Sequence, residues 1–152
     1  MNKNTHLQSC QFEEQQFATW LTSKKGASFM AQEQQQLTFL MPRAFGHYSV
    51  YLGLNYKLSS NLVSPIKNAM ALTSNFNLGG DVVMDPHQLP LASESIDLVV
   101  LQHVLDMSDN PHQTLREVAR VVNAGGRVVI TGFNPYSLWG LWRHLRLKRG
   151  LP

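Results

Sequence analysis

Two short apolar runs, with one helix between them, decide the fold of this chain. They are Ile96-Asp-Leu-Val-Val-Leu and Val128-Val-Ile-Thr, on either side of Leu115-Arg-Glu-Val-Ala-Arg-Val-Val-Asn-Ala-Gly-Gly. Short runs rich in Val, Ile and Leu are typical of strands buried on both faces of a parallel sheet. Asp109 or Asn110 can cap the helix, Pro111 suits its first turn, and Gly125-Gly126 predict its end. Strand, helix and strand form a βαβ unit, which predicts an open, doubly wound α/β sheet.

Similar runs earlier in the chain complete the predicted sheet. They are Tyr48–Leu52, Ala69–Leu72 and Val82–Met84. Before them, helical spacing of apolar residues predicts a helix from about residue 27 to residue 41, which Pro42 ends. Its predicted inward residues are Met30, Leu37 and Leu40. In the later helix the predicted inward stripe is Leu115, Val118, Ala119 and Val122.

Composition and charge exclude several classes of protein. The 152 residues are 43% hydrophobic and 15% charged, which is typical of one globular domain. No apolar run approaches the roughly 20 residues of a membrane span, and the N-terminus lacks the apolar core of a signal peptide, so a cytoplasmic protein is expected. Cys10 is the only cysteine, which excludes a Cys-based zinc site. The net charge of +3 arises from four basic residues after position 142, so no nucleic-acid-binding face is predicted.

The order of motifs between Asp85 and Pro135 resembles a class I, S-adenosylmethionine (SAM)-dependent methyltransferase of the small-molecule type, similar to methyltransferase type 11. The matching stretches are Asp85-Pro-His-Gln-Leu-Pro-Leu, Gln102-His-Val-Leu-Asp and Arg127-Val-Val-Ile-Thr-Gly-Phe-Asn-Pro. The resemblance implies a Rossmann-like sheet preceded by N-terminal helices, SAM as cofactor and a small-molecule acceptor. It divides the single domain 1–152 into helices (1–45), an α/β core (46–135) and a basic amphipathic tail (136–152).

In such sheets, ligands bind at the carboxyl ends of the strands. The resemblance implies that Asp85 accepts a hydrogen bond from the adenine amino group, whereas Pro86 has no N–H for the adenine ring. The alternative for Asp85 is a carboxylate that caps a turn. His103 is the candidate catalytic base, and a structural hydrogen-bonding role is its alternative. The expected cofactor-binding residues are Gly53, Asn55, Asp85, Pro86, His87 and Gln102.

The first half of the chain departs from the family. Where members have an acidic residue and a glycine-rich turn, this chain has Val50-Tyr-Leu-Gly-Leu-Asn-Tyr-Lys, so Tyr51 stands at the acidic position and only Gly53 fits the pattern. No Asp or Glu occurs between Glu33 and Asp81. We therefore expect neutral groups to hold SAM, the candidates being Asn55, Ser59, Ser60 and Thr73. The competing hypothesis is a non-catalytic module that keeps the fold for binding or interaction.

Three further predictions concern structure. Asp97 opens a strand and is expected to be structural. Glu117 lies between Arg116 and Arg120 and is expected to form an ordinary surface pair with an arginine. The family adds two strands after the last one found here, so the strand around Val128–Thr131 is predicted to be a sheet edge that pairs two copies into a dimer. Alternatively the amphipathic segment Ser137–Arg149 covers that edge, or touches an anionic membrane surface.

Overall fold

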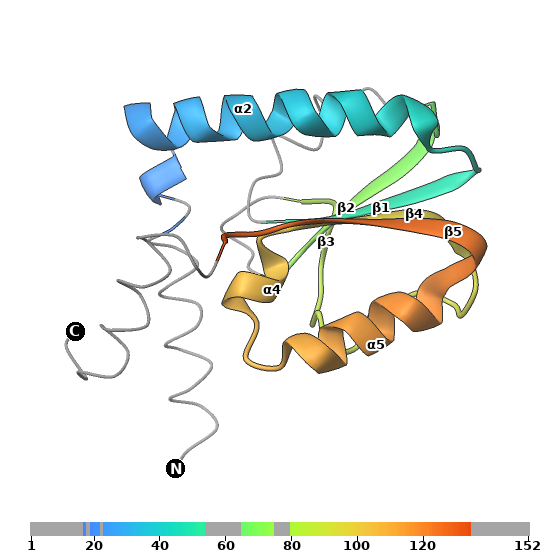
Figure 1. The fold of residues 1–152 in the computed structure, drawn as a ribbon. Helices are drawn as coiled ribbons and strands as arrows, with labels where there is room; N and C mark the ends of the chain where they lie inside the picture. The colour runs from blue at the N-terminus through green and yellow to red at the C-terminus, as the bar shows by residue number, and fades with distance from the viewer. Residues whose placement is uncertain (1–16, 18, 22, 54–64, 75–79, 135–152) are drawn as a thin grey trace, which may run out of the picture.

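The fold is a parallel sheet with helices on both faces. The computed structural model describes residues 17, 19–21, 23–53, 65–74 and 80–134. In these residues five strands form one sheet in the order β3-β2-β1-β4-β5, and every neighbouring pair is parallel. Helix α2 covers one face and α5 the other (Figure 1). The strand order reverses direction at β1, so the predicted doubly wound α/β sheet is confirmed.

All five predicted strands are present. Their bounds are β1 Tyr48–Gly53, β2 Asn68–Thr73, β3 Val82–Val83, β4 Ile96–Gln102 and β5 Val122–Thr131. The helices are α2 Lys24–Leu40, α4 Val104–Met107 and α5 Pro111–Val121, with a 3-10 turn, η1, at Met41–Arg43. Asn55, Ser59, Ser60 and the segment Ser137–Arg149 lie outside the described residues.

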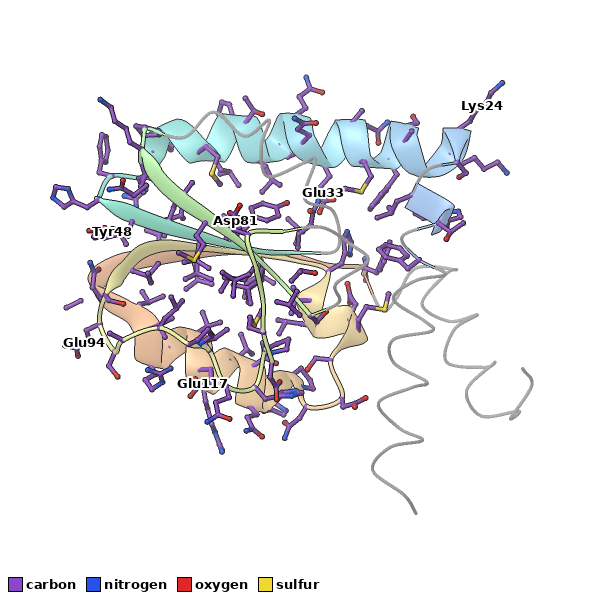
Figure 2. The ribbon with its side chains drawn as sticks, turned by 180° about the vertical axis from the view of Figure 1, so that it is seen from behind. Lys24, Glu33, Tyr48, Asp81, Glu94 and Glu117 are labelled. Carbon is purple, nitrogen blue, oxygen red and sulfur yellow. The ribbon has the colours of Figure 1, made fainter. Side chains whose placement is uncertain are left out.

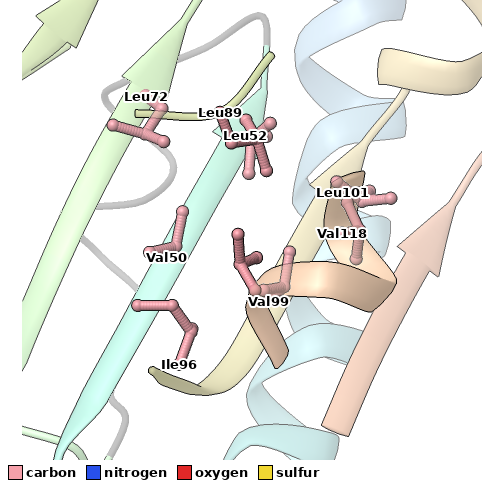
Figure 3. Close-up of a cluster of buried hydrophobic side chains, with 9 residues drawn as sticks. Val50, Leu52, Leu72, Leu89, Ile96, Val99, Leu101 and Val118 are labelled. Atoms are coloured by element: carbon pink, nitrogen blue, oxygen red, sulfur yellow. The ribbon is translucent and has the colours of Figure 1, made fainter. Parts of the chain in front are cut away.

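Both faces of the central strands are buried, as the short apolar runs predicted. Val50, Leu52, Val99 and Leu101 point toward α5 and pack against Val118 (Figure 3). The alternate residues of β1 and β4 face α2, where they form a second cluster whose members are Leu37, Met41, Ala44, Tyr51, Ile66, Leu98 and Val100. Each fully buried Val or Leu contributes roughly 1.5–3 kcal/mol through its transfer from water. The sheet therefore has two apolar layers, one on each side.

Helix α2 begins at a capped turn and ends in a tighter one. Ser23 accepts a hydrogen bond from Gly26 N at 3.2 Å. Met30 and Leu37 are buried as predicted, but Leu40 is 43% exposed, so its inward placement was wrong. The α-helix ends at Leu40, and the following 3-10 turn rotates Met41 into the core instead.

Helix α5 confirms the predicted cap but ends earlier than expected. Asn110 Oδ1 accepts from Gln113 N at 3.2 Å, and Pro111 is the first helical residue. The prediction that Gly125-Gly126 end the helix was wrong, because extended backbone starts at Val122 and continues as β5. Gly125 lies inside that strand with φ of 92°, near a shift in the register against β4.

The buried side of α5 also differs from the predicted stripe. Thr114, Val118 and Val121 are the buried residues, whereas Ala119 is exposed. Leu115 is half-buried against the core, and Val122 belongs to the strand. The face of α5 that packs on the sheet is therefore shifted by about one residue toward the N-terminus of the helix, and it includes Thr114.

Asp97 is structural, as its place near the start of β4 predicted. Its Oδ2 accepts hydrogen bonds from His47 N at 2.6 Å and Tyr48 N at 2.9 Å, and its Oδ1 accepts one from Asn123. These bonds hold the pKa of Asp97 below its ordinary value. A side chain at Gly46 would overlap Asp97, because its Cβ would lie 2.2 Å from Asp97 Cβ. One carboxylate thus joins the starts of β1, β4 and β5.

Strand β5 is the edge of the sheet within the described residues, and Val128 and Ile130 on it are 40% and 50% exposed. The dimer through this edge stays a prediction.

No described helix is long and apolar enough to cross a membrane.

Candidate functional site at the carboxyl ends of the strands

Three neighbouring strands end level with one another. Gly53 of β1 is opposite Gln102 of β4, and Gln102 is opposite Thr131 of β5. Parallel strands place their carboxyl ends at the same edge, which is where doubly wound sheets bind ligands. Gly53 and Gln102, both predicted to bind the cofactor, therefore lie side by side at the expected edge.

Gln102 joins Tyr51 to helix α2. The Tyr51 hydroxyl donates a hydrogen bond to Gln102 Oε1, and Gln102 Nε2 donates to Glu33 Oε2 at 2.9 Å. Burial, together with the nearby charge of Glu33, raises the pKa of Tyr51, so its hydroxyl stays neutral. A Cβ at Gly53 would lie 2.9 Å from the Tyr51 ring and 3.3 Å from Gln102 Cβ. The glycine therefore leaves space for this pair of side chains.

His103, the candidate base, is buried between two carboxylates. Its Nδ1 lies 3.0 Å from Asp106 Oδ2, and its Nε2 lies 3.4 Å from Glu33 Oε1. Three phenylalanine rings surround the imidazole, with ring centroids at 4.4 Å (Phe133), 5.4 Å (Phe17) and 5.8 Å (Phe29). The backbone of His103 is left-handed, with φ of 57°, which is uncommon for a non-glycine residue. We call Glu33, Gln102, His103 and Asp106 the Glu33 cluster.

The electrostatics of the cluster favour a charged imidazole. Burial alone would lower the pKa of His103, but the nearby carboxylates of Asp106 and Glu33 outweigh it and raise that pKa to about 9. Burial likewise opposes ionisation of Glu33, yet His103 and Gln102 keep its pKa below the ordinary value. A histidine that is already protonated near pH 7 cannot accept a proton. The geometry therefore favours the structural alternative for His103 over the catalytic base.

Two buried polar atoms beside Glu33 make no hydrogen bond of ordinary geometry with a described residue. They are His103 Nε2 and Thr131 Oγ1. Thr131 lies close enough to help lower the pKa of Glu33. Most buried polar groups in folded proteins have a partner, so each exception needs an explanation. The hydrogen-bonding capacity of the Glu33 cluster is therefore not fully used.

Glu33 was not predicted as a site residue. No acid follows it in the chain until Asp81, and helix α2 brings Glu33 itself to the strand ends. Figure 2 shows Glu33 on the side of α2 that faces the sheet. A signal was available, because Met30, Glu33 and Leu37 share one helix face at spacings of three and four residues. A carboxylate between two buried apolar residues is unusual, since Glu is almost never buried unless it is paired.

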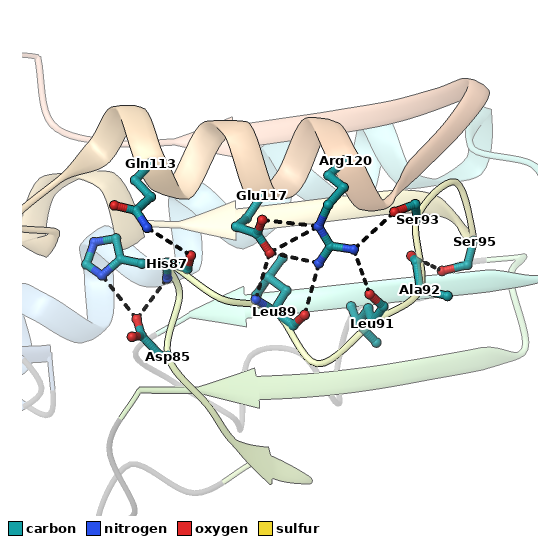
Figure 4. A network of polar contacts seen from close by, with 10 residues as sticks. All are labelled: Asp85, His87, Leu89, Leu91, Ala92, Ser93, Ser95, Gln113, Glu117 and Arg120. Atoms are coloured by element: carbon teal, nitrogen blue, oxygen red, sulfur yellow. Dashed lines mark hydrogen bonds and ion pairs between the residues drawn. The ribbon is translucent and has the colours of Figure 1, made fainter.

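Asp85 and His87 lie in the turn that follows β3. Asp85 Oδ1 accepts from His87 N at 2.8 Å and lies 3.0 Å from His87 Nδ1 (Figure 4). His87 Nε2 lies 3.1 Å from Ser108 Oγ, and the His87 carbonyl accepts from Gln113 at 3.4 Å. The turn role that we considered for Asp85 is therefore present. Its side chain is still 62% exposed, so the ligand role of Asp85, Pro86 and His87 stays a prediction.

Glu117 and Arg120 form more than the surface pair that we predicted. Glu117 Oε2 lies 2.7 Å from Arg120 Nη2 and accepts from Leu89 N at 3.0 Å. The same guanidinium donates to the carbonyls of Leu89 and Leu91 at 3.0 and 2.9 Å and to Ser93 Oγ at 3.3 Å (Figure 4). This Glu117–Arg120 clamp fixes the segment before β4 onto α5. Among the described residues, no three His, Cys, Asp or Glu side chains are grouped to hold a metal ion.

Comparison with known proteins agrees with the fold just described. The methyltransferase domain family matches residues 46–130, and the chain belongs to that family. The Escherichia coli protein YafS is 33% identical over 114 residues, which are 71% of this chain and 45% of YafS. The chain thus spans about half the length of that relative.

Two solved structures show the same fold. A SAM-dependent methyltransferase of Thermotoga maritima superimposes with a TM-score of 0.62 at 19% identity, covering 79% of this chain and 59% of its own. One from Archaeoglobus fulgidus superimposes with a TM-score of 0.63 at 17% identity, covering 74% and 57%. At these identities the similarity concerns the fold alone.

Proposed function

We propose that this protein takes part in SAM-dependent methyl transfer to a small-molecule acceptor. The observation that supports this most is the level ending of β1 and β4 at Gly53 and Gln102, in a chain of the methyltransferase domain family. When bound, SAM supplies a methyl group on a positively charged sulfur. Transfer of that group is an in-line displacement, which depends mainly on proximity and alignment.

The residues at the edge fit this cofactor in part. Gly53 has no side chain to obstruct the end of β1, and the Asp85 carboxylate is exposed after β3 and can accept a hydrogen bond from an adenine amino group. Pro86 cannot donate to the adenine ring. We assign adenine recognition to Asp85, with His87 beside it, and the strand-end contacts to Gly53, Asn55 and Gln102.

For His103 we propose a positioning role. Its imidazolium lies between Glu33 and Asp106, and its backbone N–H donates to the Thr131 carbonyl at 3.0 Å. These contacts join α2 to the ends of β4 and β5. Displacement from a sulfonium needs a base only when the acceptor must lose a proton, so a fixed cation here does not conflict with methyl transfer.

A non-catalytic module is the second candidate. The observation in its favour is Tyr51, which occupies the family's acidic position as a buried, neutral hydrogen-bond donor to Gln102. Such a strand end resembles a packed structural contact more than a cofactor site. This hypothesis predicts binding of neither SAM nor S-adenosylhomocysteine.

Calorimetry with both ligands tests the proposal, on the wild type and on Asp85→Ala. We expect binding to the wild type, and a loss of about 1–3 kcal/mol in Asp85→Ala from the missing hydrogen bond. Glu94→Ala, an exposed carboxylate before β4, is the matched control and should bind like the wild type. Equal affinity of Asp85→Ala would remove Asp85 from the site. No binding by the folded wild type would favour the non-catalytic module.

A further inference from the structure

Glu33 receives little positive charge from the residues around it. Its Oε2 accepts from Gln102, a neutral amide, at 2.9 Å. Among the described residues, the cation beside it is His103, whose Nε2 lies 3.4 Å from Oε1. That ring lies closer to Asp106, at 3.0 Å, so one imidazolium serves two carboxylates. The Thr131 side chain also lies close enough to lower the pKa of Glu33. A carboxylate accepts up to about four hydrogen bonds, so even with Gln102, His103 and Thr131 counted as donors Glu33 can accept one more.

The position of Glu33 makes this capacity relevant to a ligand. Its carboxylate is hydrogen-bonded to Gln102, which ends β4 beside Gly53. The Glu33 side chain is mostly buried but 11% exposed. His103 Nε2 and Thr131 Oγ1, both buried beside it, have no hydrogen bond of ordinary geometry within the described residues. An incompletely bonded anion at the ligand edge therefore lies in surroundings where water screens its charge poorly.

We propose that Glu33 binds the α-ammonium group at the amino-acid end of SAM. This inference rests on the proposed function and names one contact in the same site. An ammonium has three N–H donors and a full positive charge, which an acceptor-only carboxylate matches directly. The sulfonium of SAM has no N–H or O–H to donate, so the ammonium is the better partner. This proposal differs from the expectation that neutral groups hold SAM, because it adds a carboxylate at the amino-acid end.

Three ligands separate this contact from a general effect on the site. SAM has the sulfonium and the ammonium, S-adenosylhomocysteine has only the ammonium, and 5′-methylthioadenosine has neither. Calorimetry would compare their affinities for the wild type, for Glu33→Gln and for Glu94→Gln. Glu33→Gln removes the charge at nearly constant shape, and Glu94→Gln makes the same change at an exposed residue before β4 (Figure 2).

In Glu33→Gln we expect SAM and S-adenosylhomocysteine to bind about 10- to 100-fold more weakly, as for the loss of a hydrogen bond between charged groups. Methylthioadenosine should keep its affinity to within about twofold of the wild type, which also shows that the variant is folded. Glu94→Gln should bind all three like the wild type. This pattern would assign the effect of Glu33→Gln to the amino-acid end of the ligand, where the ammonium is the group that a carboxylate attracts.

Other results would overturn the inference. Equal weakening of all three ligands would make Glu33 a support for the shape of the site, and weakening of SAM alone would assign it to the sulfonium. If the wild type binds and Glu33→Gln binds equally well, this contact is absent while the proposed function stands. If the wild type binds none of the three, both proposals fail. If Glu33→Gln does not fold, Glu33→Asp, whose shorter side chain withdraws the carboxylate, replaces it. Glu33→Asp must then weaken SAM and S-adenosylhomocysteine more than methylthioadenosine. Unchanged affinities of Glu33→Asp for all three ligands would reject the contact.

Discussion

The Glu117–Arg120 clamp and the Glu33 cluster are two carboxylate–cation groups associated with opposite faces of one sheet, and they differ in how completely they are bonded. In the clamp, the guanidinium contacts a carboxylate, two carbonyls and a hydroxyl, and the carboxylate also accepts a backbone N–H. In the Glu33 cluster, one imidazolium lies between two carboxylates, and a ring nitrogen is left without an ordinary hydrogen bond. Full bonding is expected of a part that only holds the fold together. Incomplete bonding at a strand end is expected where a ligand supplies the missing partner.

The largest effect should come from removing the buried cation of the Glu33 cluster. His103→Gln leaves Glu33 and Asp106 facing each other without the imidazolium, and loss of one member of a buried ion pair typically costs about 3–5 kcal/mol. Urea unfolding at pH 7 measures this loss. The control is His112→Gln, an exposed histidine on α5, which should change stability by less than about 0.5 kcal/mol. If both variants are equally stable, the imidazolium contributes nothing to the fold.

A smaller and gradual effect should follow from pH. The pKa of His103 is raised to about 9 in the folded protein, against 6.5 for an ordinary histidine. Its contribution to stability is therefore complete below about pH 6.5 and is lost as pH rises through about 9, to a total on the order of 3 kcal/mol. Unfolding free energies of the wild type and His103→Gln, measured between pH 6 and pH 10, should converge as pH rises. A constant difference between them would contradict the raised pKa.

The smallest effect should come from the clamp, because it is open to water. Glu117→Gln keeps the shape of the side chain but weakens its bonds to Arg120 and Leu89 N, for which we expect a loss of about 1 kcal/mol. Hydrogen exchange at the Leu89 amide should accelerate, while the affinity for SAM stays as in the wild type. A large loss of affinity for SAM in Glu117→Gln would contradict the distinction between a clamp that stabilises the fold and a Glu33 cluster that binds the ligand.

Local patterns predicted the sheet well. Short apolar runs identified all five strands, because strands that are buried on both faces keep few polar residues in their middle. The same patterns failed at Gly125-Gly126, where pairing with β4 keeps a glycine pair in extended backbone that local preference would place at a helix end. They also failed at Leu40, because a change from α-helix to 3-10 turn shifts which residue points inward.

The candidate site was predicted only in part. Asp85, Gln102 and His103 were predicted as site residues because each stands at or just after the end of a strand, and strand ends can be located from sequence. Glu33 could not be placed at the site from the strands, because it lies on a helix 69 residues before its partner Gln102. The protonated state of His103 was also out of reach, since it depends on two carboxylates that come together only in the folded chain.

The position of β4 between β1 and β5 has a consequence for how the chain folds. Strands β1 to β3 are synthesised first, but β1 pairs on its other side with β4, which follows them in sequence. Until β4 and α5 leave the ribosome, β1 lacks one of its two neighbouring strands, and its apolar side chains Val50 and Leu52 lack the helix that covers their face. Asp97 of β4 accepts hydrogen bonds both from His47, before it in the chain, and from Asn123, after it. The full set of these hydrogen bonds therefore forms late. Contacts of such long sequence separation slow folding, and nascent chains that stop before residue 96 should be exposed to aggregation and chaperone capture.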